Sequence, residues 1–220
     1  AMIDRVIERG ECDFVAELAA PLPLEVIVDL MGIPESEMEM VFQNTNRILG
    51  LGDPDMTAND QDLVGTALRA GAELAALMKE MAEDRRKRPR EDLTSVLLNA
   101  ELEGGALASE DLTSFFILLV VAGNETTRNA ISHGLKAFTD HPAQRDTWFG
   151  DFEGHTRTAV EEIVRWATPV VHFRRTVTAD TQLGGQQLHA GDKVVLFYES
   201  ANRDESVFER ADDLIIDRKN

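Results

Sequence analysis

Cysteine is nearly missing from this chain of 220 residues, because Cys12 is the only one. A single thiol excludes an internal disulfide bond, and it excludes the zinc and iron–sulfur sites that need several cysteines. Long apolar runs are missing too. The longest one, 115–122, has eight residues, whereas a membrane-spanning helix needs about 20. We therefore expect no membrane anchor, and since the start carries no signal-peptide pattern, we expect a cytoplasmic protein.

Positive charge is also scarce. The chain has 22 Lys and Arg against 40 Asp and Glu, which gives a formal net charge of −18. Binding to nucleic acid or to an anionic membrane needs clustered cations, so this balance argues against both kinds of partner. The five histidines show no metal-ligand spacing, and we expect none of them to hold a metal. An apolar content of 43% is ordinary for a globular chain.

Apolar residues recur at helical spacing through most of the chain, which predicts a mainly α protein. The predicted helices are 3–9, 13–18, 21–31 (ended by Gly32), 36–48 (capped by Ser36), 61–88, 91–102, 110–140, 144–149 and 158–166 (opened by a capping box from Thr158 to Glu161). The clearest loop is 50–59. After Pro169 the period changes to alternation in 173–180 and 194–198, with turns between, which predicts a small antiparallel sheet.

The predicted helix 110–140 is the most informative element. Its apolar stripe contains three small residues, Gly123, Thr126 and Ala130. Glycine inside a helix costs about 1 kcal/mol relative to alanine, so a reason is needed, and one reason is the close approach of another body. That body is either a packed helix, with Glu125 turned to solvent, or a flat ligand. A Thr126 hydroxyl bonded to the carbonyl four residues earlier would open the helix locally.

A second polar pair lies on the helix that ends near Pro169. Glu161 and Glu162 both come within reach of Arg165, at i,i+4 and i,i+3. Spacing alone slightly favours Glu161, and such pairs are common on ordinary helix surfaces. Alone, this pattern is a very weak signal.

Four sequence motifs follow one another along the chain in the order and spacing of a known family: AGNETT (122–127), EEIVR (161–165), FRRTVTAD (173–180) and ESANRDESVF (199–208). Together they are similar to the cytochrome P-450 family, the haem-thiolate monooxygenases. The residues of these motifs are most similar to those of the actinobacterial branch that hydroxylates methyl-branched lipids and steroid side chains. The resemblance implies one domain of the P-450 fold, truncated at both ends. Its parts would be a helical body at about 1–169, a small β region at about 170–200 and a connecting segment at 201–220.

The resemblance also implies residue roles. Glu125 and Thr126 match the acid–alcohol pair that delivers protons to bound dioxygen. Glu162, rather than Glu161, and Arg165 match a structural pair that supports the haem pocket. Haem contact is implied for Leu118, Ala122, Gly123, Thr126 and Arg175, with Arg175 meeting a propionate. Substrate contact is implied for Val121, Val171 and Phe173.

Two expected parts of the family pattern are not found in these residues. The cysteine that ligates haem iron is expected beyond Asn220, and Cys12 lies outside any matching motif. We therefore expect this chain as it stands to lack the spectrum of a thiolate-ligated haem. In many members an arginine joins the Glu–Arg pair, and the matching position here is taken to be Asp213, which predicts an incomplete triad.

The implied reaction inserts one oxygen atom of dioxygen into a C–H bond of a hydrophobic lipid, and the other atom leaves as water. Haem b would be the cofactor, and electrons would come from a ferredoxin and its reductase. Two rival readings stay open. One is an acidic helical interaction module without haem, and the other is a non-catalytic piece of a monooxygenase.

Overall fold

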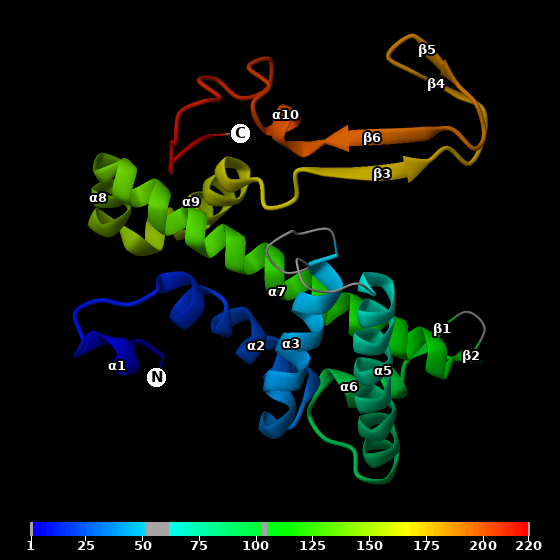
Figure 1. Ribbon diagram of the computed structural model, residues 1–220. Helices are drawn as coiled ribbons and strands as arrows, with labels where there is room; N and C mark the ends of the chain where they lie inside the picture. Colours follow the sequence, from blue (N-terminus) through cyan, green and yellow to red (C-terminus); the bar gives the residue numbers. More distant parts are fainter. Residues whose placement is uncertain (1, 52–61, 103–104, 220) are drawn as a thin grey trace. The chain divides into compact units, whose positions relative to one another are not determined.

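The computed structural model describes residues 2–51, 62–102 and 105–219, and it is mainly helical, as the sequence predicts (Figure 1). The described elements are α1 (Met2–Ile7), a π-helix (Val15–Ala19), α2 (Pro21–Met31), a 3₁₀ turn (Glu35–Glu37), α3 (Met38–Leu49), α5 (Leu63–Lys87), α6 (Leu93–Leu98), β1 (Glu101–Leu102), β2 (Gly105–Ala106), α7 (Ser109–Asp140), α8 (Pro142–Gly150), α9 (Phe152–Ala167), β3 (His172–Thr176), β4 (Thr181–Leu183), β5 (Gln186–Leu188), β6 (Lys193–Phe197) and α10 (Tyr198–Asn202). They fall into two compact units, Ala1–Arg128 and Asn129–Asn220.

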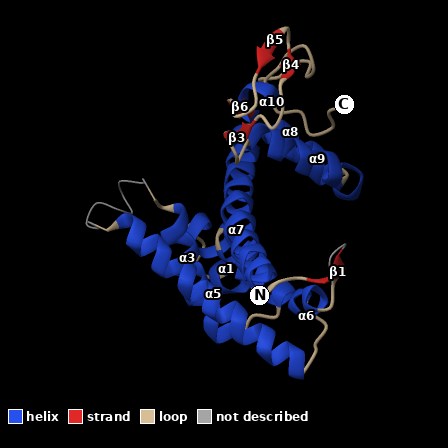
Figure 2. Cartoon of the chain, turned by 90° about the vertical axis from the view of Figure 1, so that its right-hand side faces the viewer, coloured by secondary structure: helices blue, strands red, loops and turns tan. Residues whose placement is uncertain are grey.

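The predicted central helix is confirmed. It runs without interruption as α7 from Ser109 to Asp140, and Figure 2 shows it as a single helix. Its first half carries a stripe at i, i+4 and i+8 that is buried in the first unit: Leu112, Phe116 and Val120. Helices α2, α3 and α5 supply the rest of this core, with Leu24, Ile27, Val28, Met31, Val41, Leu74, Leu77 and Met78 among the buried residues.

The end of α2 is held by a buried polar junction. Gly32 takes the left-handed conformation that closes the helix, with φ of 70°. Arg85, near the end of α5, donates from Nη2 to the Gly32 carbonyl at 2.7 Å and from Nε to the Asp92 carboxylate at 2.6 Å. Asp92 in turn caps α6 by accepting from the Ser95 backbone N–H at 2.8 Å. The junction therefore fixes three helix ends at one place in the first unit.

Gly32→Ala should lower the free energy of unfolding by about 3 kcal/mol, because alanine is strained in the left-handed region. The added Cβ would also lie 2.2 Å from the Asp92 carboxylate. Gly71→Ala, inside α5, is the matched control. A Cβ at Gly71 meets nothing within 4 Å, so this variant should gain about 0.5–1 kcal/mol. Urea unfolding of the full-length protein measures both, and equal effects would contradict the prediction.

The second unit has its own core. It combines α7 after Arg128 with α8, α9 and the irregular segment after α10, and its buried residues are Ala137, Phe138, Ala159, Leu214 and Ile216. Close packing of α7 on α9 explains Gly134, because a Cβ there would lie 3.1 Å from the Ile163 side chain.

The small antiparallel β region that the sequence predicted is confirmed, and its strands form separate two-stranded pairs. Strand β3 pairs with β6 in antiparallel register, from His172 opposite Phe197 to Thr176 opposite Lys193 (Figure 1). Strands β4 and β5 form a hairpin, and the pair β1–β2 was not predicted. All residues of β3 are exposed in the described part of the chain.

Two predicted helix starts are wrong. Helix α3 begins at Met38 after the 3₁₀ turn without a side-chain cap, so Ser36 does not cap it. Helix α9 begins at Phe152 rather than Thr158, because Asp151 caps it by accepting from the Gly154 backbone N–H at 3.1 Å.

The predicted helix 91–102 ends at Leu98. Most of the predicted loop 50–59 lies outside the described residues. Among those described, no helix has the length and apolar composition needed to cross a membrane.

Candidate functional site

The middle of α7 has the local bond that the sequence predicted. The Thr126 hydroxyl donates to the Ala122 carbonyl oxygen, four residues earlier, at 2.7 Å. Residues at i and i+4 share a helix face, so Leu118, Ala122 and Thr126 lie in one row. Leu118 is 63% exposed in this structure and Ala122 is exposed as well. Helix α7 therefore presents an apolar, partly uncovered face that narrows to a small residue beside a hydroxyl.

Glu125 lies next to this face and is held by an ion pair. Its Oε2 contacts Nη2 of Arg128, one turn further along α7. The two side chains are 27% and 21% exposed, so both are only partly hydrated. Glu125 is therefore not simply turned to solvent, as the helix-crossing alternative supposed. Glu125 is the chain neighbour of Thr126, and its carboxylate remains partly accessible to water.

Gly123 faces a neighbouring helix. A Cβ placed on this glycine would lie 3.1 Å from Cδ1 of Ile27 on α2, tighter than most side-chain contacts. Close helix packing therefore accounts for Gly123, and a flat ligand is not needed to explain it. This differs from the expectation that Gly123 is small because it faces haem. The partly uncovered row on α7 consists of Leu118, Ala122 and Thr126.

The Glu–Arg pair on α9 is buried, and it uses Glu162. Arg165 donates two parallel bonds to the Glu162 carboxylate, from Nε at 2.7 Å and from Nη2 at 2.8 Å. The two side chains are 6% and 2% exposed, while Glu161 lies exposed on the surface. Arg165 Nη1 also donates to the carbonyls of Asn202 and Ala211, at 2.6 and 2.8 Å. The pair thus ties α9 to the irregular segment after α10.

A third charged residue completes the cluster, and its identity corrects the sequence analysis. Arg218 donates from Nε to Glu162 Oε2 at 3.0 Å and from Nη2 to Oε1 at 3.2 Å. Asp213, which the analysis took as the matching position, offers its main-chain carbonyl to both arginines, and its carboxylate binds Arg210 at 2.6 Å. The triad is therefore complete. The available signal was Arg218 itself, five residues beyond the position that was compared.

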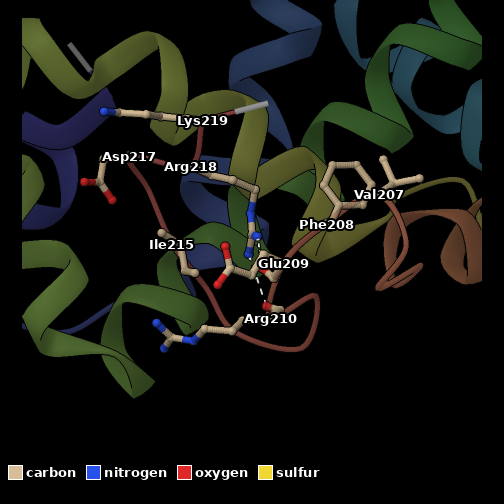
Figure 3. A pocket seen from close by; sticks show the side chains of 8 residues that line it. All are labelled: Val207, Phe208, Glu209, Arg210, Ile215, Asp217, Arg218 and Lys219. Atoms are coloured by element: carbon tan, nitrogen blue, oxygen red, sulfur yellow. Dashed lines mark hydrogen bonds between the residues drawn. The ribbon is translucent and has the colours of Figure 1, made fainter.

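A pocket of about 340 Å³ opens beside this triad. It is lined by residues of the segment after α10: Val207, Phe208, Glu209, Arg210, Ile215, Asp217, Arg218 and Lys219. The Arg218 side chain runs along its wall and donates to main-chain carbonyls of the same segment (Figure 3). All of its lining residues belong to the second unit.

The environment of Glu162 sets its ionisation. Burial alone would raise the pKa of this carboxyl, but hydrogen bonds from Arg165, Arg218 and the Ile215 backbone N–H outweigh burial and hold the pKa below its ordinary value of 4.5. A carboxyl with a lowered folded-state pKa stabilises the fold above its unfolded pKa. That contribution is lost as pH falls through the lower folded-state value.

We therefore expect the stability contribution of Glu162 to be complete above about pH 5 and to decline below about pH 4.5. Glu162→Gln should be less stable than the wild-type protein at neutral pH and should lose less stability on acidification. Urea unfolding of the full-length proteins between pH 3 and 7 measures the difference. A gap between the two that stayed constant across this range would show that Glu162 does not titrate as described.

The strand β3 supplies a basic and an aromatic side chain, both exposed. The Arg175 guanidinium lies over the Phe173 ring, 5.3 Å from its centroid, and donates to the Arg174 carbonyl at 3.1 Å. Among the described residues no carboxylate forms an ion pair with Arg175. Val171 and Phe173 are each 49% exposed. Strand β3 and the residue before it therefore expose a cation and apolar surface in the second unit.

Comparison with known proteins identifies the class. A family model for cytochrome P-450 matches residues 155–218. The methyl-branched lipid omega-hydroxylase of Mycobacterium tuberculosis is 54% identical over 198 residues, which are 90% of this chain and 45% of that protein. The steroid C26-monooxygenase of Rhodococcus jostii is 41% identical over 219 residues, covering 100% of this chain and 44% of that protein.

Solved structures agree with these relatives. A Mycobacterium marinum cytochrome P-450 in complex with pseudoionone superposes with a TM-score of 0.92 at 43% identity, covering 99% of this chain and 53% of that one. A Bacillus megaterium relative in complex with testosterone gives 0.86 at 33% identity, covering 99% and 57%. The chain belongs to the cytochrome P-450 family. It spans about half the length of the curated relatives that it matches.

The described residues include the types of side chain that bind haem. In the first unit, the row on α7 with Ala122 at its centre has the small apolar surface that a flat ring needs. In the second unit, considered by itself, the exposed Arg175 has the charge that a carboxylate needs. The described residues do not include a grouped set of iron ligands. In the described residues no three His, Cys, Asp or Glu side chains are grouped to hold a metal, and Cys12 is exposed between α1 and the π-helix.

Proposed function

We propose that the protein to which this chain belongs is a haem-dependent monooxygenase that hydroxylates a hydrophobic lipid. Two relatives that align with 90% or more of this chain carry the names methyl-branched lipid omega-hydroxylase and steroid C26-monooxygenase. They support a substrate with a branched aliphatic chain: a methyl-branched lipid, a fatty acid or a steroid side chain. We further propose that electrons arrive from a ferredoxin and its reductase.

The observation that carries this proposal is the bond from Thr126 to the Ala122 carbonyl on the exposed face of α7. Because the hydroxyl proton is donated to that carbonyl, the lone pairs of the Thr126 oxygen remain available to accept from a water molecule. Such a water can pass a proton towards the apolar face. Haem, when bound, supplies dioxygen reduction and oxygen transfer, and cleavage of the O–O bond consumes protons.

Glu125 is the second member of this proton path. Its carboxylate can take a proton from solvent, since it is 27% exposed, and release it beside Thr126. The ion pair with Arg128 holds the carboxylate in place beside the exposed row of α7. Leu118, Val121, Val171 and Phe173 would bind the aliphatic substrate and exclude bulk water. Arg175 would bind a haem propionate.

The iron ligand is proposed to lie outside residues 1–220, since Cys12 is the only thiol in the chain. The test is therefore made on the full-length protein. Its haem-bound form, with a ferredoxin, the reductase and labelled dioxygen, is given a methyl-branched fatty acid, a linear fatty acid of equal length and a branched-side-chain steroid. We expect one labelled hydroxyl group on a branched substrate. Haem binding without hydroxylation of any of the three would overturn the proposal.

A further inference from the structure

Asn124 is a buried amide without a protein partner. Its side chain is 0% exposed, and neither Oδ1 nor Nδ2 forms a hydrogen bond with any described residue. An amide transferred from water into a protein interior loses hydrogen bonds at its carbonyl oxygen and at its NH₂ group. Leaving both groups without hydrogen bonds lowers the free energy of unfolding, and native proteins rarely contain such groups.

The other fully buried polar side chains of the first unit show the usual pattern. Asn44 donates to Glu73 across α3 and α5 at 2.8 Å, and its oxygen accepts from Arg47 at 3.0 Å. Thr45 donates to the Val41 carbonyl at 2.8 Å, and Thr94 donates to that of Met31 at 2.7 Å. Asn44, Thr45 and Thr94 are each 0% exposed. Burial in this core is therefore compatible with full hydrogen bonding, and Asn124 departs from the rule.

The position of Asn124 explains why a protein partner is hard to supply. It continues the stripe of Phe116 and Val120, at i+8 and i+4, and both are 0% exposed core residues. A leucine, whose side chain has the same branched shape, would continue such a stripe without any polar group. Because the side chain is buried and no described residue pairs with it, a water molecule, which can both donate and accept, is a partner of suitable size.

We propose that Asn124 binds internal water on the core side of α7. The internal water donates to Oδ1 and accepts from Nδ2, and its remaining bonds go to main-chain carbonyl oxygens, which have a second lone pair. Successive helix residues are about 100° apart, so Asn124 points away from Ala122 and Thr126, two residues to either side. The water site is thus distinct from the proton path of the proposed function, and either can fail without the other.

A crystal structure of the full-length protein at high resolution tests the site. We expect an ordered water within hydrogen-bonding distance of the Asn124 amide and none at Asn44, the internal control. Asn124→Leu should remove that water and should reduce the number of long-lived waters counted by magnetic relaxation dispersion. An amide bonded directly to a protein group, or one with no water beside it, would overturn the proposal from the wild-type density alone.

Stability provides a second readout. Asn124→Leu replaces the amide by an apolar group of the same shape and displaces its water partner, and removing both partners of a hydrogen bond in this way is close to neutral, so the folding equilibrium constant should change by less than about tenfold. If the amide is bare, its removal relieves the penalty of burial. A gain of well over tenfold in the folding equilibrium constant would therefore contradict the water site.

Discussion

Thr126→Ala should separate the use of electrons from the formation of product in the full-length haem-bound protein. The substitution removes the hydroxyl that donates to the Ala122 carbonyl at 2.7 Å, and with it the group proposed to hold a proton-carrying water. General acid assistance is worth about 10²–10⁴ in rate. We therefore expect the fraction of electrons that appear in hydroxylated product to fall by about tenfold or more, while reductant consumption continues and hydrogen peroxide accumulates.

Two matched variants on the same helix control this experiment. Thr127→Ala changes the exposed neighbour of Thr126. Thr139→Ala removes a back-bond of the same kind, to the Leu135 carbonyl at 2.8 Å, from an exposed position near the end of α7. Both should keep the wild-type ratio of product to reductant, and Thr126→Ser should restore much of it. Equal uncoupling in Thr126→Ala and Thr139→Ala would assign the effect to helix distortion and remove Thr126 from the proton path.

The fold of α7 was predictable from local pattern alone. A sustained apolar stripe over about eight turns has no competing interpretation, and the helix found, Ser109–Asp140, differs from the predicted one by a single residue. Helix starts were less predictable. Thr158 to Glu161 has the spacing of a capping box, but Asp151 caps the helix two turns earlier, and the residues between the two continue the same helix.

At the candidate site, too, local contacts could be predicted from the sequence and long-range contacts could not. The bond from Thr126 to Ala122 is local, four residues long, and the sequence predicted it. The direction that Gly123 faces is not local, because it depends on Ile27 of α2, almost a hundred residues away in the chain. Small residues on a helix show that something approaches closely, but they do not show what. The burial of Asn124 is equally a property of the packed core.

The choice between Glu161 and Glu162 could not be made from spacing. Spacing on a free helix slightly favours the i,i+4 pair, whereas the structure uses i,i+3. What decides is the face of α9 that is buried and the approach of Arg218, whose guanidinium reaches Glu162 from 56 residues further along the chain. Once two arginines converge on one buried carboxylate, Glu162 is fixed as the partner.

Glu162→Ala should therefore be among the most destabilising single changes in this chain. The variant leaves Arg165 and Arg218, whose side chains are 6% and 8% exposed, without the carboxylate that neutralises them. Removing one partner of a buried ion pair typically costs about 3–5 kcal/mol. Glu161→Ala is the matched control. It changes the adjacent, exposed glutamate and should stay within about 0.5 kcal/mol of the wild-type protein.

The pairing itself is tested by a double-mutant cycle in the full-length protein. If Glu162 and Arg218 stabilise the fold through one another, Arg218→Met and Glu162→Gln should cost clearly less together than the sum of their separate effects, by about 1–3 kcal/mol. Urea unfolding at pH 7 gives all four free energies. Additive costs would mean that Arg218 acts mainly through its bonds to the carbonyls of Glu209, Arg210 and Asp213. In that case the pocket segment would be held by main-chain hydrogen bonds, and the Glu162 carboxylate would act through Arg165 and the Ile215 backbone N–H.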